Sequence, residues 1–320
     1  MTTISQPNIP INIYRFCFKT DSLPRLPDFP GSAWRGAFGH ALKKTVCVVR
    51  NQACNQCLLK NACAYSIVFE TPPPTNTEKM RKYTAAPHPF VLQFPVITGQ
   101  ASTSYSLDVI LFGHGQRYFP YIVHAFKQAG QHGIGGRQQV FNLVQVDEIN
   151  QRGEAETIFD NGELNPLKPP EKIVIPVMPQ HIKINFNTQL RLKQDNKNLG
   201  APGFNFGTFF TILLRRISMI SYFYTESPLE TDFAALTAKA RTVQFSSQQL
   251  DWYDWTRYSS RQQTEIIMGG VMGFVELSMQ DLEDFWPYLW LGQWTHLGKG
   301  TSMGMGAYQI EMTSLSTTQD

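Results

Sequence analysis

The sequence predicts an α+β fold made of two tandem ferredoxin-like βαββαβ domains. The chain has 320 residues, which exceeds one average domain and suggests two domains of about 150 residues each. In the first half, strand-type and helix-type patterns follow one another in the order β-α-β-β-α-β. A similar order recurs after a proline-rich stretch. The 42% of hydrophobic and 17% of charged residues are typical of a globular protein that buries a real core.

The first domain is predicted over residues 1–165. Ile11–Lys19 is rich in β-branched and aromatic residues, which favour a strand. Ser32–Val46 is a predicted helix, because its apolar side chains recur at helical spacing. A cysteine-rich insertion at 47–69 comes next. Two strands, a helix and a further strand complete the predicted domain: Pro89–Thr98, Ser104–Phe112, Tyr118–Ala129 and Gln138–Val146.

The stretch Asp160–Pro176 holds four prolines and several charges, which predicts a linker. The second domain is predicted over residues 170–320. It begins with extended chain over Ile182–Leu192, and a strongly apolar helix follows from Phe206 to Ile220. A strand, a helix and a last strand are expected at Ile266–Leu277, Asp281–Leu291 and Ala307–Met312. Residues 232–261 fit no element of this scheme clearly.

The formal net charge of +3 is small, but the charges are unevenly distributed. No Asp or Glu lies between Asp28 and Glu70, or between Asp284 and Glu311. Such segregation either builds a basic face or reflects strands and loops that contain few charges. No signal peptide and no apolar run of about 18 residues is present, so we expect a soluble cytoplasmic protein without membrane contact. The sequence also lacks the metalloprotease and nucleophile-elbow motifs and any acidic cluster suited to two-metal nuclease chemistry.

A glycine-rich loop close to the C-terminus is the most informative motif. Four glycines fall within nine residues around a single lysine, and a strand-like segment follows: Gly298, Lys299, Gly300, Gly304 and Gly306. Glycine allows positive φ and close approach to the backbone, and a lysine in such a loop suits a phosphate. Neither the Walker A spacing nor the dinucleotide fingerprint fits these residues. The loop therefore predicts a phosphate-backbone contact of another kind.

This loop resembles the C-terminal signature of the RAMP superfamily of CRISPR-associated proteins. Its flanks resemble most the endoribonucleases that process precursor CRISPR RNA, of the Cas protein six type. Gly31–Leu42 resembles the first helix of that family, Asn187–Leu192 with Leu213–Ile217 resembles the opening of its second domain, and Gly269–Phe274 with Tyr288–Gly300 resembles its end. The resemblance spans most of the chain, and the terminal loop is its specific part.

The resemblance implies two RAMP-type domains, related to RNA-recognition motifs, that hold CRISPR repeat RNA, as precursor and as product. It implies metal-independent cleavage that leaves a 2′,3′-cyclic phosphate and a 5′-hydroxyl. The alternatives are a non-cleaving RNA-binding subunit of a CRISPR effector complex, and a general single-stranded RNA-binding protein. Subunits of such complexes are expected partners. The residues expected to contact RNA are Arg35, Lys43 and Arg137, together with the five residues of the glycine-rich loop.

His40 is the candidate catalytic residue, because the family places a catalytic histidine on this first helix. On a helical wheel His40 and Lys44 fall opposite the apolar side, and Gly36 lies one turn before them. A histidine can transfer protons near neutral pH, and a lysine can stabilise a phosphorane. The alternative is an exposed helix histidine without a role. His296, three residues before Lys299, is the strongest rival, and no tyrosine is assigned as the second proton-transfer group.

Four of the five cysteines fall within seventeen residues, with the spacing C-x6-C-x2-C-x5-C: Cys47, Cys54, Cys57 and Cys63. A C-x2-C pair in such a cluster can bind a structural zinc through four thiolates. An iron–sulfur cluster and simple reduced cysteines are the alternatives, since disulfides are rare in the cytoplasm. No cofactor is expected for catalysis.

Two further segments could contact RNA. Gly130–Arg137 is either a phosphate-contacting loop with Arg137 as its anchor or a plain surface connection. The aromatic cluster at Trp252–Trp255 and Tyr258 alternates with Arg257 and Arg261, and it could stack bases or pack between the domains.

Overall fold

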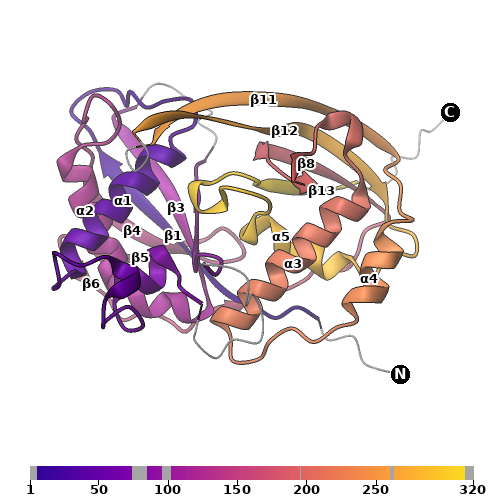
Figure 1. Cartoon of the computed structure of the whole chain (residues 1–320), viewed down its shortest axis with the longest axis horizontal. Coiled ribbons are helices and arrows are strands. Elements are labelled where there is room, and N and C mark those ends of the chain that lie inside the picture. Colours follow the sequence, from indigo (N-terminus) through magenta and orange to yellow (C-terminus); the bar gives the residue numbers. More distant parts are fainter. Residues whose placement is uncertain (1–5, 74–84, 96–101, 195, 260–262, 314–320) are drawn as a thin grey trace. The chain divides into compact units, whose positions relative to one another are not determined.

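The computed structural model describes residues 6–73, 85–95, 102–194, 196–259 and 263–313. The chain divides into two compact units (Figure 1). The N-terminal unit comprises Ile9–Ile173 and Tyr222–Glu226. The C-terminal unit comprises Met1–Asn8, Val174–Ser221 and Ser227–Asp320. No helix in the described part of the chain combines the length and the apolar character needed to cross a membrane.

The N-terminal unit is built on an antiparallel sheet in which four strands lie in the order β2-β3-β1-β4. The two outer strands of this set are thus the second and the fourth along the chain, which is the ferredoxin-like arrangement. The fold class is confirmed. The strands and their two crossover helices are β1 (Pro10–Lys19), α1 (Gly31–Val46), β2 (Phe90–Gln93), β3 (Ser104–Phe112), α2 (Phe119–His132) and β4 (Asn142–Ile149).

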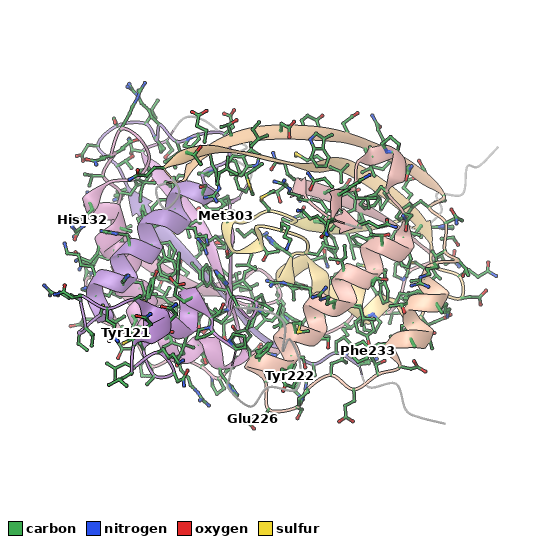
Figure 2. The ribbon with its side chains drawn as sticks, viewed as in Figure 1. Tyr121, His132, Tyr222, Glu226, Phe233 and Met303 are labelled. Carbon is green, nitrogen blue, oxygen red and sulfur yellow. The ribbon has the colours of Figure 1, made fainter. Side chains whose placement is uncertain are left out.

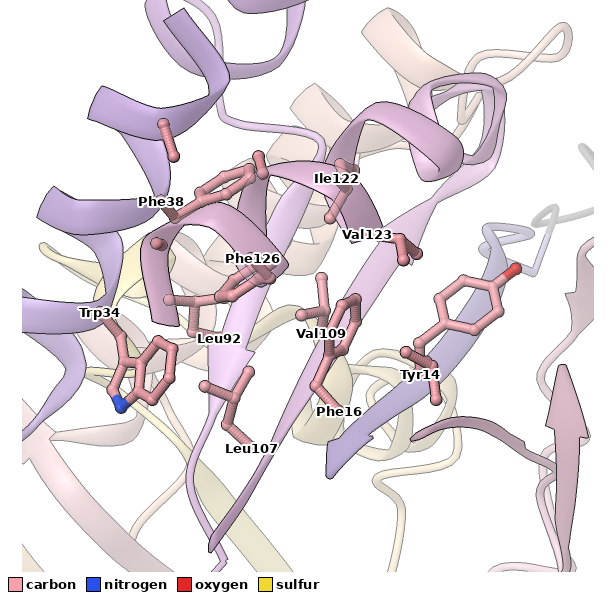
Figure 3. Close-up of a cluster of buried hydrophobic side chains, with 14 of the residues drawn as sticks. Tyr14, Phe16, Trp34, Phe38, Leu92, Leu107, Val109, Ile122, Val123 and Phe126 are labelled. Atoms are coloured by element: carbon pink, nitrogen blue, oxygen red, sulfur yellow. The ribbon is translucent and has the colours of Figure 1, made fainter. Parts of the chain in front are cut away.

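Both helices cover one face of this sheet, and β1 accordingly alternates between buried and partly exposed residues. Its buried side chains Tyr14 and Phe16 pack against α2, where Phe16 and Phe126 have ring centroids 4.8 Å apart. Phe126 in turn stacks on Phe38 of α1 at 4.6 Å. Figure 3 shows part of this cluster, and its labelled side chains come from α1, α2, β1, β2 and β3. Packing against this core fixes the rotation of α1 about its own axis, and so decides which of its residues face outward.

Three more strands extend the N-terminal unit, and two of them lie within the predicted linker. β5 (Ala155–Asp160) pairs with β4, β6 (Glu163–Leu164) pairs with β5, and β7 (Glu171–Lys172) pairs with β1. Five of the seventeen residues of the predicted linker, Asp160–Pro176, lie in these strands, and the boundary between the two units, after Ile173, falls within it. The prolines are compatible with these strands, because they fall outside β5, β6 and β7 and remove no ladder hydrogen bond.

The C-terminal unit repeats the topology with the strand order β11-β12-β8-β13. Its elements are β8 (His181–Leu190), the short hairpin β9 (Lys193–Gln194) and β10 (Lys197–Asn198), α3 (Phe206–Tyr224), α4 (Phe233–Ala240), β11 (Ser247–Ser259), β12 (Thr264–Ser278), α5 (Trp286–Thr295) and β13 (Tyr308–Thr313). The predicted apolar stripe of α3 is buried, and Phe210 packs edge-to-face on Phe285 at 4.5 Å. Residues 232–261, which the sequence left unassigned, hold α4 and the long strand β11 (Figure 1).

Candidate nucleic-acid interface

The outward side of α1 carries the predicted catalytic pair. His40 and Lys44 are both exposed, and they lie one turn apart on this helix. Within the described chain, no hydrogen bond or ion pair holds the imidazole of His40. Gly36, a further turn before it, is exposed, and a Cβ added there meets nothing within 4 Å. The helix therefore presents a histidine and a lysine beside open backbone, as the apolar periodicity predicts.

Arg35 lies beside this face but is engaged by its own unit. Its Nη2 lies 2.8 Å from Nε2 of His88, and its guanidinium carbon lies 4.3 Å from the ring centroid of Phe69. Lys43 is exposed, with Nζ 5.5 Å from the ring centroid of Tyr65. Stacking on aromatic rings holds both cations near the outer side of α1. Their contact with RNA stays a prediction.

The cysteine-rich insertion folds back onto α1 through an aromatic pair. The ring of Phe69 occupies the space where a side chain on Gly39 would stand, 2.2 Å from the ideal Cβ position. Tyr65 stacks on Phe69 at 5.4 Å, and its hydroxyl donates to Glu70 at 2.9 Å. Burial, together with this hydrogen bond and the charge of Glu70, raises the pKa of Tyr65 well above its ordinary value. Tyr65 is therefore a packing residue, protonated at neutral pH.

The four clustered cysteines occupy different environments within the insertion. Cys54 and Cys63 pack against the core of the N-terminal unit. The thiol of Cys47 donates to the carbonyl oxygen of Val49 at 3.3 Å. Among the residues that the structure describes, no three His, Cys, Asp or Glu side chains gather into a set that could hold a metal ion. The predicted structural zinc stays a prediction.

Backbone hydrogen bonds hold the glycine-rich loop, residues 298–306, in which Figure 2 labels Met303. Its four predicted glycines all have positive φ, between 70° and 93°. A Cβ at Gly306 would stand 1.9 Å from the carbonyl oxygen of Leu297, and one at Gly298 would stand 2.6 Å from that of Arg191. The loop thus needs glycine for its own fold. Gly304 and Gly306 are buried, whereas Lys299 is exposed. Contact of these residues with RNA stays a prediction.

His296 is not available as a catalytic residue, which corrects the rival assignment. It is fully buried, and its Nδ1 lies 3.2 Å from the carbonyl oxygen of Met305, so this nitrogen donates. Burial lowers its pKa to about 3, which outweighs the opposing effect of that hydrogen bond. A neutral, enclosed imidazole cannot exchange protons with a substrate near neutral pH. His296 instead ties the end of α5 to the glycine-rich loop.

The remaining predicted segments divide between surface and packing. Arg137 is exposed after α2, in a turn closed by the bridge between Ile134 and Gln139, and its RNA contact stays a prediction. The indole of Trp252 donates to Asp254 at 2.9 Å, and this pair covers Gly269 of the neighbouring strand. Packing inside the sheet thus accounts for part of the aromatic cluster. The side chains of Tyr258 and Arg261 lie outside the described residues.

Two family models match the chain in succession. Residues 9–172, just over half of the chain, match the family AF_1859_N, described as an N-terminal domain, and this part belongs to that family. Residues 184–308 match the family of the CRISPR-associated endoribonuclease Cas6. The C-terminal part of the chain is therefore Cas6-like. The Cas6 match ends at Tyr308 and therefore contains the whole glycine-rich loop.

Solved structures of Cas6 proteins share the fold of this chain at low sequence identity. A Cas6 product complex is 14% identical with a TM-score of 0.57, covering 94% of this chain and 99% of the other. Thermus thermophilus Cas6 is 13% identical with a TM-score of 0.54, covering 95% and 99%. A partial complex of Cas6, reverse transcriptase, Cas1 and Cas2 gives 0.57 at 13% identity, over 99% of this chain and 48% of that one. An Archaeoglobus fulgidus protein described as uncharacterized is 22% identical over 293 residues, which is 89% of this chain and 92% of the relative.

Proposed function

We propose that this Cas6-type protein binds CRISPR repeat RNA and cuts precursor CRISPR RNA into guide units without a catalytic metal. The outward side of α1 supports this proposal most directly. His40 and Lys44 are exposed together, and Gly36 leaves open space beside them. A phosphodiester can approach a helix closely only where no side chain stands in the way.

The proposed reaction is an internal transesterification of the RNA. The 2′-oxygen attacks phosphorus while its proton passes to a base, and the bond from phosphorus to the 5′-oxygen breaks as that oxygen gains a proton. The products are a 2′,3′-cyclic phosphate and a 5′-hydroxyl. His40 would make one of the two proton transfers, and Lys44 would stabilise the charge on the phosphorane. The second proton-transfer group is not assigned.

Cleavage of repeat RNA in excess EDTA tests the mechanism. We expect cleavage to persist, and His40→Ala to slow it by about 10²–10⁴-fold with little change in RNA affinity, because phosphate contacts dominate binding. Lys44→Ala should lose less, since a neighbouring cation partly substitutes. His124→Ala, which removes an exposed histidine of α2, is the matched control and should cleave at the parental rate.

Three results would redirect the proposal. Activity that is lost in EDTA and restored by magnesium alone would contradict general acid–base cleavage. Tight binding of repeat RNA without any cleavage would identify a non-cleaving RNA-holding subunit of an effector complex. Equal affinity for unrelated single-stranded RNA, again without cleavage, would indicate a general RNA-binding protein.

CRISPR effector subunits are proposed as protein partners.

A further inference from the structure

The short hairpin formed by β9 and β10 is attached to the glycine-rich loop. The backbone N–H of Lys299 donates to the carbonyl oxygen of Arg191 at 3.0 Å, just before β9 begins. Two buried leucines, Leu192 and Leu199, flank the hairpin and are joined by a backbone hydrogen bond of 3.0 Å. The hairpin is therefore fixed at its base, and Lys299 is fixed next to it.

The register of the hairpin assigns its side chains to two opposite faces. Lys193 pairs with Asn198, and Lys197 pairs with Gln194, so each pair shares a face. Arg191 lies on the Lys193 face, because its Nε donates to Oδ1 of Asn198 at 3.3 Å. The side chain of Gln194 turns instead toward the start of α3, where the hydroxyl of Thr208 donates to it at 3.3 Å. One face thus carries Arg191 and Lys193, and the other carries Lys197.

Lys193 on the first face of the hairpin and Lys299 of the glycine-rich loop have no acidic partner within the described chain. Lys193 and Lys299 are exposed, and neither forms an ion pair or side-chain hydrogen bond with a described residue. Arg191 is half-buried, and within the described chain its guanidinium donates to neutral groups: Asn198, the carbonyl of Ile267 and the sulfur of Met268. Like charges held close together repel one another and attract an anion of matching spacing. A chain of phosphates supplies such an anion.

We propose that the Lys193 face of the β9–β10 hairpin is a second phosphate-binding element, which continues the contact of Lys299 along the backbone of a single-stranded RNA. This inference rests on the proposed function, because it takes RNA as the ligand of the glycine-rich loop. Lys193 and Lys299 then contact successive parts of one RNA strand. Arg191, on the same face of the hairpin as Lys193, adds a further positive charge. Lys197, on the opposite face of the same hairpin, takes no part.

The salt dependence of binding distinguishes the two faces. RNA affinity is measured across a series of salt concentrations for the parent, Lys193→Gln and Lys197→Gln, with repeat RNA and with an uncleavable homopolymer. Lys193→Gln should weaken both RNAs roughly 3–10-fold and lower the slope of log affinity against log salt by about 0.7, the value for one phosphate contact on a single strand. Lys197→Gln, with the same charge change on the same hairpin, should leave the slope unchanged.

Chemical acetylation of the parent protein, with and without RNA, shows which lysines the RNA covers and needs no substitution. Bound RNA should protect Lys193 and Lys299 and leave Lys197 reactive. Equal effects of the two substitutions, or equal protection of Lys193 and Lys197, would overturn the inference while the proposed function stands. Weaker homopolymer binding by Lys193→Gln, in a protein that neither prefers nor cuts repeat RNA, would support this site and refute the function. A parent that binds neither RNA would refute both.

Discussion

Glycine has two different roles in this chain, and Gly306 and Gly36 are examples of them. Gly306 has a φ of 70°, and the carbonyl oxygen of Leu297 occupies the space beside its Cα. Gly36 lies in regular helix, and nothing occupies the space beside it within 4 Å. The fold requires the first glycine and only tolerates the second. An open glycine in a helix, where alanine would stabilise, indicates a requirement imposed from outside the fold.

Alanine at these two glycines should therefore have opposite effects on stability. Gly306→Ala should destabilise the protein by roughly 1–3 kcal/mol. Alanine is strained in the left-handed backbone conformation, and its Cβ would clash with the carbonyl oxygen of Leu297. Gly36→Ala should stabilise it by about 0.5–1 kcal/mol. Urea unfolding measures both changes. If the space above Gly36 receives the phosphodiester, the more stable Gly36→Ala protein should also cleave RNA more slowly, and an unchanged cleavage rate would exclude that role.

His296 should make stability depend on pH. Its pKa is lowered to about 3 by burial, whereas an unfolded histidine titrates near 6.5, so the folded state binds fewer protons. This contribution is complete above about pH 6.5 and falls as the pH decreases toward 3, by up to about 2 kcal/mol at pH 5. Unfolding of the parent and of His296→Gln should converge at low pH. Parallel pH profiles for the two proteins would show that the pKa of His296 is the same in the folded and the unfolded state.

At the scale of elements, α1 and the insertion form one assembly. Phe69 packs onto Gly39, Arg35 stacks on Phe69, and the cysteine-rich chain lies between them in sequence. The insertion therefore restrains the helix that carries His40, whether or not it also binds an ion. The role of its cysteines is best tested by comparing two neighbours, because Cys54 packs against the core and Cys57 does not belong to that packing.

If four thiolates hold a structural ion, Cys54→Ser and Cys57→Ser should each release it and lower the melting temperature alike. Elemental analysis of the native protein should then find close to one zinc or iron per chain. A different pattern would assign the cysteines to packing: less than about 0.2 ion per chain, a destabilised Cys54→Ser protein and an unaffected Cys57→Ser protein.

The sequence predicts most elements of this fold, and its failures have physical causes. Helix α1 and strand β1 are predictable because one face of each is packed against the core and the other is not, which imposes a period, whereas β3 is predictable as a nearly continuous run of buried apolar residues. Strand β11 was missed because the sheet buries it only in part, so its aromatic and charged residues do not alternate cleanly. The residue pattern likewise could not separate His40 from His296. Only burial, a property of the tertiary structure, distinguishes the two.

At the scale of the whole molecule, both units use the same strand order without an evident sequence repeat. Each has its own core, and the N-terminal core is built around the contact between Phe38 and Phe126. Multidomain chains of this kind generally depart from two-state unfolding. The topology could be predicted from the order of elements, whereas the exact limit between the units could not, because short strands occupy the proline-rich stretch.

Damage to one core should therefore stay within its unit. Phe38→Ala removes a ring that is 1% exposed and should cost about 3–5 kcal/mol in the N-terminal unit. Hydrogen exchange followed by peptide mass spectrometry should show faster exchange in β1, β3 and α2, with β8, β12 and α5 unchanged. Faster exchange throughout the chain would indicate that the two units unfold as one.

The position of β8 in its sheet has a consequence for the time course of folding. β8 lies between β12 and β13, and the hydroxyl of Thr188 in β8 accepts a hydrogen bond from Ala307, 119 residues further along the chain. Closing so long a loop costs conformational entropy before any strand contact compensates for it, so this pairing forms slowly. Helices α3 and α4 can form meanwhile from local contacts. β8, the first strand of this sheet along the chain, is thus the last to gain its partners. Until then both of its edges can pair with another chain.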